Sequence, residues 1–174
     1  MQNARLAKTI FVLLSVSALV YFWNSYSRLP EVVVSHFDGQ GRPNGWQTKS
    51  AFFDVFLGTT VLSALLVFGV PALVKALPGR LINLPNKQYW LGPEQRAATF
   101  EFLSSGFAWF GCAVFLLIFF AFNYAVQSNL HPDHPPSPSG MWFALLAFLV
   151  FAIVWISRLI LRFARTPQNS SIAK

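Results

Sequence analysis

Five side chains of the kinds that bind metal ions lie in two polar segments of the chain. One segment holds His36 and Asp38, and the other holds His131, Asp133 and His134. Imidazole and carboxylate groups are ligands for zinc and other divalent cations, so a site would form if the two segments met. The second segment is also rich in proline, which is typical of a solvated turn, and a histidine near its ordinary pKa can act as a pH sensor. Metal binding is therefore one of three hypotheses for these residues.

Side chains that perform covalent or acid–base catalysis are not grouped anywhere in the sequence. The single cysteine, Cys112, falls within a long apolar run, and the six acidic residues are dispersed. No Ser-His-Asp set, Cys-His pair or pair of neighbouring carboxylates can be assembled from such spacing. The glycines after Asp38 match neither a dinucleotide-binding nor a P-loop pattern. We therefore predict a non-enzymatic protein without a cofactor.

The polar segment from Leu29 to Lys49 is the main candidate for recognition of a ligand. It contains a valine run of high β propensity and, further along, Asn44-Gly45, a strong signal for a hairpin turn with positive φ at both positions. We expect a small hairpin or compact loop. The candidate ligand-recognition residues are Leu29, Pro30, His36, Asp38, Gly41, Asn44, Gly45 and Lys49.

Long apolar segments must position these residues. Apolar residues make up 55% of the chain and charged residues only 11%, whereas a soluble domain carries about 25% charged residues. Four windows reach the length of roughly 20 residues that spans a bilayer, at about 9–26, 51–76, 100–127 and 141–163. The first lacks a convincing cleavage site and is interpreted as an uncleaved signal anchor. We predict an all-α membrane protein, a single domain over 1–174, with four transmembrane helices and a short hairpin-like loop between the first two.

Within these spans, three local patterns predict how the helices bend and pack. Pro71 predicts a kink in the second span. Small residues at 104, 108 and 112 predict a face for close helix packing in the third. Glu101 and the arginines at 158 and 162 lie at the same expected depth, where they either pair or extend separately to the interface.

The distribution of basic residues predicts the orientation in the membrane. Ten of the 13 lysines and arginines flank the two termini and the middle loop, and three lie in the first loop. The positive-inside rule then places both termini in the cytoplasm and loops 27–50 and 128–140 outside the membrane. Because these charges are scattered among membrane flanks, nucleic-acid binding is not expected. The expected location is the bacterial cytoplasmic (inner) membrane.

The middle loop contains a second polar segment, residues 83–91. It is either an ordered connector at the membrane surface or a docking surface for a membrane or cytoplasmic protein partner. The docking candidates are Asn83, Pro85, Asn86, Lys87, Tyr89 and Trp90.

Two segments together resemble a bacterial membrane family called domain of unknown function 1648. The first segment comprises Leu29-Pro30, Ser35-His36-Phe37-Asp38, Gly41 to Trp46, and Lys49 after an initial span, and the second runs from Asn83 to Leu91. The first resemblance, with its flanking spans, covers roughly residues 10 to 75. The family includes a toxin immunity protein to which this chain is similar in part. The resemblance implies an integral membrane protein with an outward recognition loop and a role in immunity or signal transduction.

The sequence therefore predicts a sensing, immunity or signalling protein that recognises a ligand, such as a peptide, through its outer loop. A structural subunit of a larger membrane complex is the first alternative. A metal-dependent or transport role is the second, although the lack of ionisable residues near the membrane midplane disfavours coupled transport.

Overall fold

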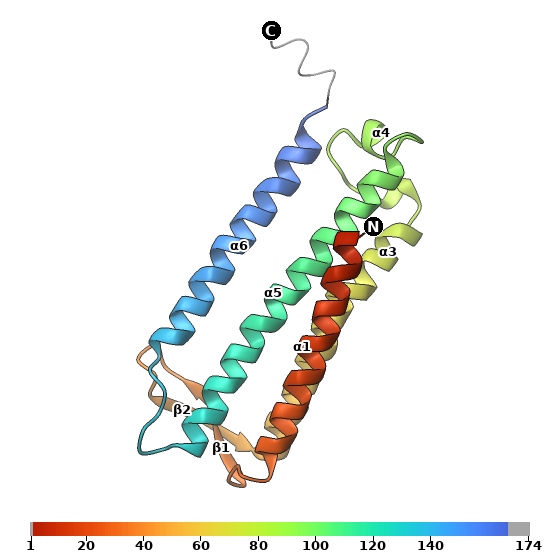
Figure 1. Ribbon diagram of the computed structural model, residues 1–174. Coiled ribbons are helices and arrows are strands. Elements are labelled where there is room, and N and C mark those ends of the chain that lie inside the picture. The colour runs from red at the N-terminus through yellow and green to blue at the C-terminus, as the bar shows by residue number, and fades with distance from the viewer. Residues whose placement is uncertain (1, 167–174) are drawn as a thin grey trace.

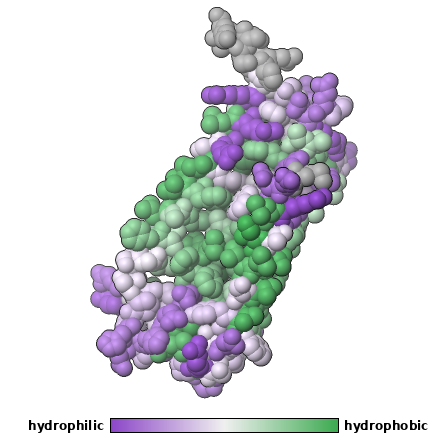
Figure 2. All heavy atoms as spheres, in the orientation of Figure 1, coloured by the Kyte–Doolittle hydropathy of each residue, from purple (hydrophilic) through white to green (hydrophobic). Residues whose placement is uncertain are grey.

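The computed structural model describes residues 2–166 and has four helices that are long and apolar enough to cross a membrane. They comprise α1 (Gln2–Tyr26), a composite helix from Lys49 to Ala76, α5 (Arg96–Leu130) and α6 (Ser139–Ala164). Figure 1 shows them side by side, with the hairpin at one end of the bundle and α4 (Lys87–Trp90) at the other. The prediction of four transmembrane helices is confirmed. Figure 2 shows the expected apolar belt between two polar ends.

The hairpin pairs β1 (Val32–Phe37) with β2 (Pro43–Thr48) in antiparallel orientation. It lies between α1 and α2 (Lys49–Ala64), as the sequence predicts. At its end, the side chain of Thr48 accepts a hydrogen bond from the backbone N–H of Ala51 at 3.2 Å and caps the start of α2. The change from strand to helix is therefore fixed at this residue.

The second span departs from α-helical geometry in its second half. A π-helical turn, η1 (Leu65–Gly69), separates α2 from α3 (Val70–Ala76). Pro71 provides no N–H for a hydrogen bond to the preceding turn, so the irregularity predicted near this residue occurs one turn before it. A short 3-10 helix, η2 (Gly79–Leu81), follows in the loop that leads to α4.

The central element is α5, which packs against α1 and the composite helix on one side and against α6 on the other. Small residues allow the close approach on the first side. Ala108 and Cys112 are buried, and a Cβ on Gly111 would collide with Val67 of η1. The Cys112 thiol donates to the carbonyl of Ala7 at 3.3 Å. The predicted small-residue packing face is confirmed.

Aromatic side chains fill the core between α1, α2 and α5. Phe22 lies 4.1 Å from Phe56 between ring centroids, and Phe122 contacts both rings. Nearer the hairpin, Tyr21 donates a 2.6 Å hydrogen bond to Asn123 and accepts one from Gln127. Such polar pairs between helices add to the packing forces that hold helices together in lipid.

By contrast, α6 is the most exposed of the four spanning helices. Phe163 is its only buried residue. Figure 1 shows the helix set apart along one side of α5. The rings of Trp155 and Phe110 stack with centroids 4.5 Å apart and bridge the two helices near their middle.

Candidate functional site

The turn of the hairpin is organised by Asp38. One carboxylate oxygen accepts hydrogen bonds from the backbone N–H groups of Gln40 and Arg42, both at 2.9 Å, and the other lies 2.7 Å from Nε of Arg42. These bonds from the Arg42 backbone and guanidinium lower the pKa of Asp38 below its usual value. Asp38 is therefore held as a carboxylate and fixes the shape of the turn.

The prediction that Asn44-Gly45 forms the turn is wrong. Both residues lie in β2, and Gly41 is the only glycine among residues 2–166 with positive φ, at 80°. The physical reason is the side chain of Asp38, which accepts hydrogen bonds from the N–H groups of Gln40 and Arg42 and so closes the turn before the chain reaches Asn44-Gly45. Gly45 lies opposite His36 instead, where a Cβ would come within 2.9 Å of the Cβ of His36.

Two side chains fasten the hairpin to the helices. The amide of Asn129 on α5 accepts from the N–H of Val34 and donates to its C=O, both at 2.8 Å, as a neighbouring strand would. On the other side, Trp142 of α6 donates from its indole to the carbonyl of Gly39 at 3.2 Å. The hairpin is therefore connected to both α5 and α6.

A cavity of about 400 Å³ lies where the hairpin meets α5 and α6, and we call it the hairpin cavity. His36, Asp38 and Gly41 line it, so the structure brings three predicted recognition residues together. Its walls are largely apolar, because Phe37, Tyr124 and Trp142 contribute aromatic rings and Met141 and Leu145 contribute aliphatic side chains. The rings of Phe37 and Tyr124 meet edge to face at 5.0 Å.

The polar groups of the hairpin cavity are few. The Ser35 hydroxyl is buried and has no hydrogen-bond partner among the described residues, and the His36 side chain is exposed. An apolar pocket with a small number of oriented polar groups is the usual form of a site for a small organic ligand or a peptide side chain. The hairpin cavity therefore suits an amphipathic ligand.

A second cavity, of about 590 Å³, lies on another side of the same turn. It is lined by Leu29 and Pro30, together with prolines 132 and 135 of the loop between α5 and α6. Phe37 and Gly41 line both cavities. Five of the eight predicted recognition residues thus lie around this turn.

The other three predicted recognition residues line neither cavity. Asn44 and Gly45 belong to β2, and Lys49 lies at the start of α2. The ammonium group of Lys49 pairs with Glu31 at 2.8 Å and lies 5.1 Å from the centre of the Tyr26 ring. Lys49 therefore holds the two ends of the hairpin together.

The five metal-ligand candidates do not form a site. Among residues 2–166 no group of three or more His, Cys, Asp or Glu side chains is placed to hold a metal ion. Asp38 is hydrogen-bonded to Arg42. The other candidate segment is exposed in the next loop, with His131, Asp133 and His134. The described residues therefore give the metal hypothesis no support.

The candidate docking segment holds the end of α6 in place. Asn86, at φ 52°, donates from its side chain to the carbonyls of Phe163 at 2.9 Å and Ala164 at 3.2 Å. Trp90 is buried and donates to the same Phe163 carbonyl at 3.2 Å. These bonds satisfy carbonyls that the end of a helix leaves without partners.

The other docking candidates differ in exposure. Lys87 donates to the carbonyl of Arg80 at 2.9 Å, and the Tyr89 ring packs on Trp90. Only Asn83 and Pro85 are exposed without such a described contact. The segment therefore fastens the end of α6, as the connector interpretation expects, and the docking interpretation stays a prediction.

Sequence reasoning missed four contributors to the site: Ser35, Tyr124, Asn129 and Trp142. Tyr124 and Trp142 fit the ordinary pattern of aromatic anchors at the membrane interface, which conceals a second role. Asn129 is a weak indication of a structural contact, because a polar amide at the end of a spanning helix is also expected where the helix simply leaves the membrane. Val34 and Asn129 are 95 positions apart in the sequence, so no local pattern indicates that they pair.

Residues 10–60 match the family model described as Domain of unknown function (DUF1648). The matched region contains most of α1, the whole hairpin and most of α2, so the resemblance to this family is confirmed there. No curated protein and no solved structure matches the chain.

Proposed function

We propose that this multi-pass membrane protein, whose residues 10–60 carry the DUF1648 domain, is a non-enzymatic receptor for a peptide outside the cytoplasm. The observation that carries the proposal is the hairpin cavity, where predicted recognition residues meet aromatic side chains and the buried Ser35 hydroxyl, which has no hydrogen-bond partner among the described residues. The ligand's apolar side chain enters between Tyr124 and Trp142. Its backbone or a polar substituent bonds to Ser35 and His36.

The chemistry of the cavity favours binding over catalysis. Asp38, which lines the cavity, already accepts bonds from Gln40 and Arg42, so its carboxylate has a structural task. Within the described chain, no Asp or Glu side chain makes a hydrogen bond or ion pair with His36. A catalytic base is normally oriented by such a partner. Binding requires only the shape and polarity that these residues supply.

The connections of the hairpin offer a route for a signal. A ligand in the hairpin cavity contacts the turn that Trp142 joins to α6, and Asn129 joins the neighbouring strand to α5. At the far end of the bundle, Asn86 and Trp90 join the end of α6 to the loop before α5. A change in the spacing of α5 and α6 at the hairpin would therefore reach the exposed residues Asn83 and Pro85. A cytoplasmic protein partner would detect it there.

The proposed setting is the bacterial cytoplasmic membrane, with both termini in the cytoplasm and the hairpin outside. The excess of lysine and arginine at the termini and the middle loop supports this orientation. Immunity against an external toxin and signal transduction are both compatible with a receptor of this design. Both begin with recognition at the hairpin.

Two tryptophans provide a test. The Trp142 indole lines the hairpin cavity, whereas Trp46, which is exposed to a similar extent, lies in the hairpin and lines neither cavity. In detergent-solubilised protein with ¹⁵N-labelled indoles, the peptide fraction of the source organism's conditioned medium should shift the Trp142 signal and leave Trp46 unchanged. His36→Ala should weaken the response, whereas the control Asn44→Ala should preserve it. Equal shifts at both indoles, or no shift at either, would contradict the proposal.

A further inference from the structure

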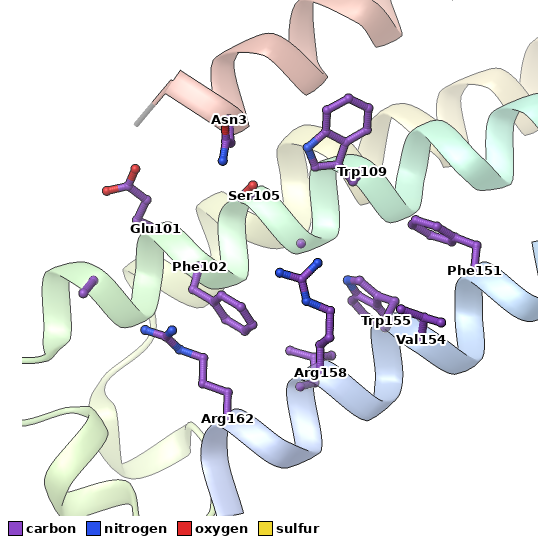
Figure 3. A pocket seen from close by; sticks show the side chains of 13 residues that line it. Asn3, Glu101, Phe102, Ser105, Trp109, Phe151, Val154, Trp155, Arg158 and Arg162 are labelled. Carbon is purple, nitrogen blue, oxygen red and sulfur yellow. The ribbon is translucent and has the colours of Figure 1, made fainter. Parts of the chain in front are cut away.

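A third cavity, which we call the arginine cavity, lies between α5 and α6 toward the α4 end of the bundle. Its volume is about 620 Å³, and Asn3 of α1 closes one side. Figure 3 shows Arg158 and Arg162 projecting from α6 toward α5. The hairpin cavity shares no lining residue with it, so its chemistry is independent of the proposed function.

The depth of this cavity matches a membrane surface. Arg158 lies nineteen residues after Ser139, the first residue of α6, which is about 28 Å along a helix. The hydrocarbon core of a bilayer is about 30 Å thick. The arginine is thus at the level where hydrocarbon gives way to lipid headgroups. Toward the middle of the bilayer, the cavity wall becomes apolar and consists of Trp109, Phe151 and Val154.

Two buried donors at this cavity have no acceptor. They are Nε of Arg162 and Nε1 of Trp155, and neither has a hydrogen-bond partner among the described residues. Arg162 is also held in place, because its guanidinium lies 4.3 Å from the centre of the Phe102 ring and 5.2 Å from that of Trp90. A fixed guanidinium whose Nε–H has no acceptor among the described residues is suited to the oxygens of a phosphate.

The charge of the cavity further limits the class of ligand that it can bind. Among the described residues that line it, the ionisable side chains are Arg158, Arg162 and Glu101, whose charges sum to +1. A phosphodiester with one negative charge balances this net charge, whereas a zwitterionic headgroup contributes none. The continuous apolar wall beyond the arginines is suited to an acyl chain.

We propose that the arginine cavity binds an anionic phospholipid of the phosphatidylglycerol class, with its phosphate at Arg158 and Arg162 and an acyl chain along Trp109 and Phe151. The lipid fills the gap between α5 and α6 and holds α6 in its position. The site requires only a bilayer surface at the α4 end, whichever side of the membrane that is.

Native mass spectrometry of the full chain provides the test. The protein is released from a mild detergent after incubation with equimolar phosphatidylglycerol and phosphatidylethanolamine. We expect phosphatidylglycerol to be retained preferentially. Arg158 is exposed, and Arg158→Gln removes its charge-assisted hydrogen bond to the lipid phosphate. This variant should lower the retention of phosphatidylglycerol about tenfold. The matched control is Arg165→Gln, because Arg165 is exposed at the same helix end and does not line the cavity.

A second variant tests the apolar part of the site. Ser105→Phe places a ring in the cavity and leaves both arginines in place, so it should also lower retention of the lipid. Helical content by circular dichroism confirms that each variant is folded. Equal retention of the two lipids, an equal loss in Arg165→Gln, or full competition by free glycerol phosphate would overturn the proposal. The last result would identify a site for soluble phosphate.

Discussion

At the residue scale, Gly41 is where two constraints on the hairpin coincide. Its φ of +80° is a conformation that other residues rarely adopt, and a Cβ there would lie 2.7 Å from the Tyr124 hydroxyl. Gly140 near the start of α6 has open space around it. Both glycines lie near the hairpin end, so they form a matched pair for substitution.

We predict that Gly41→Ala destabilises the protein and that Gly140→Ala does not. The left-handed conformation alone costs a residue with a Cβ about 1–2 kcal/mol, and displacement of Tyr124 adds to this cost. The midpoint of thermal unfolding in detergent measures the difference. Equal midpoints for the two variants would show that the turn adjusts freely.

Asp38 makes the turn dependent on pH in a defined direction. Its pKa is lowered from 3.8 by hydrogen bonds from Arg42, so the folded hairpin favours the carboxylate. The stabilisation is therefore complete above the unfolded value of 3.8 and is lost as the pH falls through the lower folded value. In an NMR titration, the amide signal of Arg42 should titrate with a midpoint below 3.8, and it should not titrate in this range in Asp38→Asn. A midpoint at or above 3.8 in the natural protein would refute this role of Arg42.

At the scale of elements, α6 contacts the rest of the protein near its ends and, between them, through aromatic contacts of Phe148 and Trp155 with α5. Asn86 and Asn83 lie in the same loop, but only Asn86 bonds to the last carbonyls of α6. We predict that Asn86→Ala speeds amide hydrogen exchange in the last turns of α6, since each lost bond costs about 1 kcal/mol. Asn83→Ala should leave that exchange unchanged. Matching exchange rates in the two variants would mean that the aromatic contacts alone hold the helix.

The elements also differ in how far the sequence could predict them. The spans follow from local composition, because some 20 consecutive apolar residues have few alternatives to crossing a bilayer. The hairpin was also predictable from local sequence, because a run of valines is followed closely by turn-forming residues. The position of its turn was not, since the Asp38 side chain closes the turn before Asn44-Gly45. The contacts of Trp90 with Phe163 and of Asn129 with Val34 join residues far apart in the chain. Single-sequence patterns contain no information about such pairs, so the cavities could not be predicted.

At the scale of the whole molecule, the proposed orientation determines which cavity meets which compartment. Gln40 lies in the hairpin turn and Gln88 in α4, and both are exposed. Figure 1 shows the hairpin and α4 at opposite ends of the bundle. In a Cys112→Ser background, a membrane-impermeant maleimide applied to intact cells should label Gln40→Cys and should label Gln88→Cys only after lysis. The charge asymmetry is the physical reason for this expectation. The reverse pattern would invert the proposed topology.

The central claim is that the hairpin cavity binds a peptide from outside the cytoplasm. The most direct measurement places a photo-crosslinking amino acid at His36, which lines the cavity, and at Asn44, which is exposed on the same hairpin and does not. Intact cells are irradiated in conditioned medium and the protein is analysed by mass spectrometry. The account predicts a peptide adduct at position 36 and none at position 44. No adduct at position 36, or equal adducts at both positions, would contradict it.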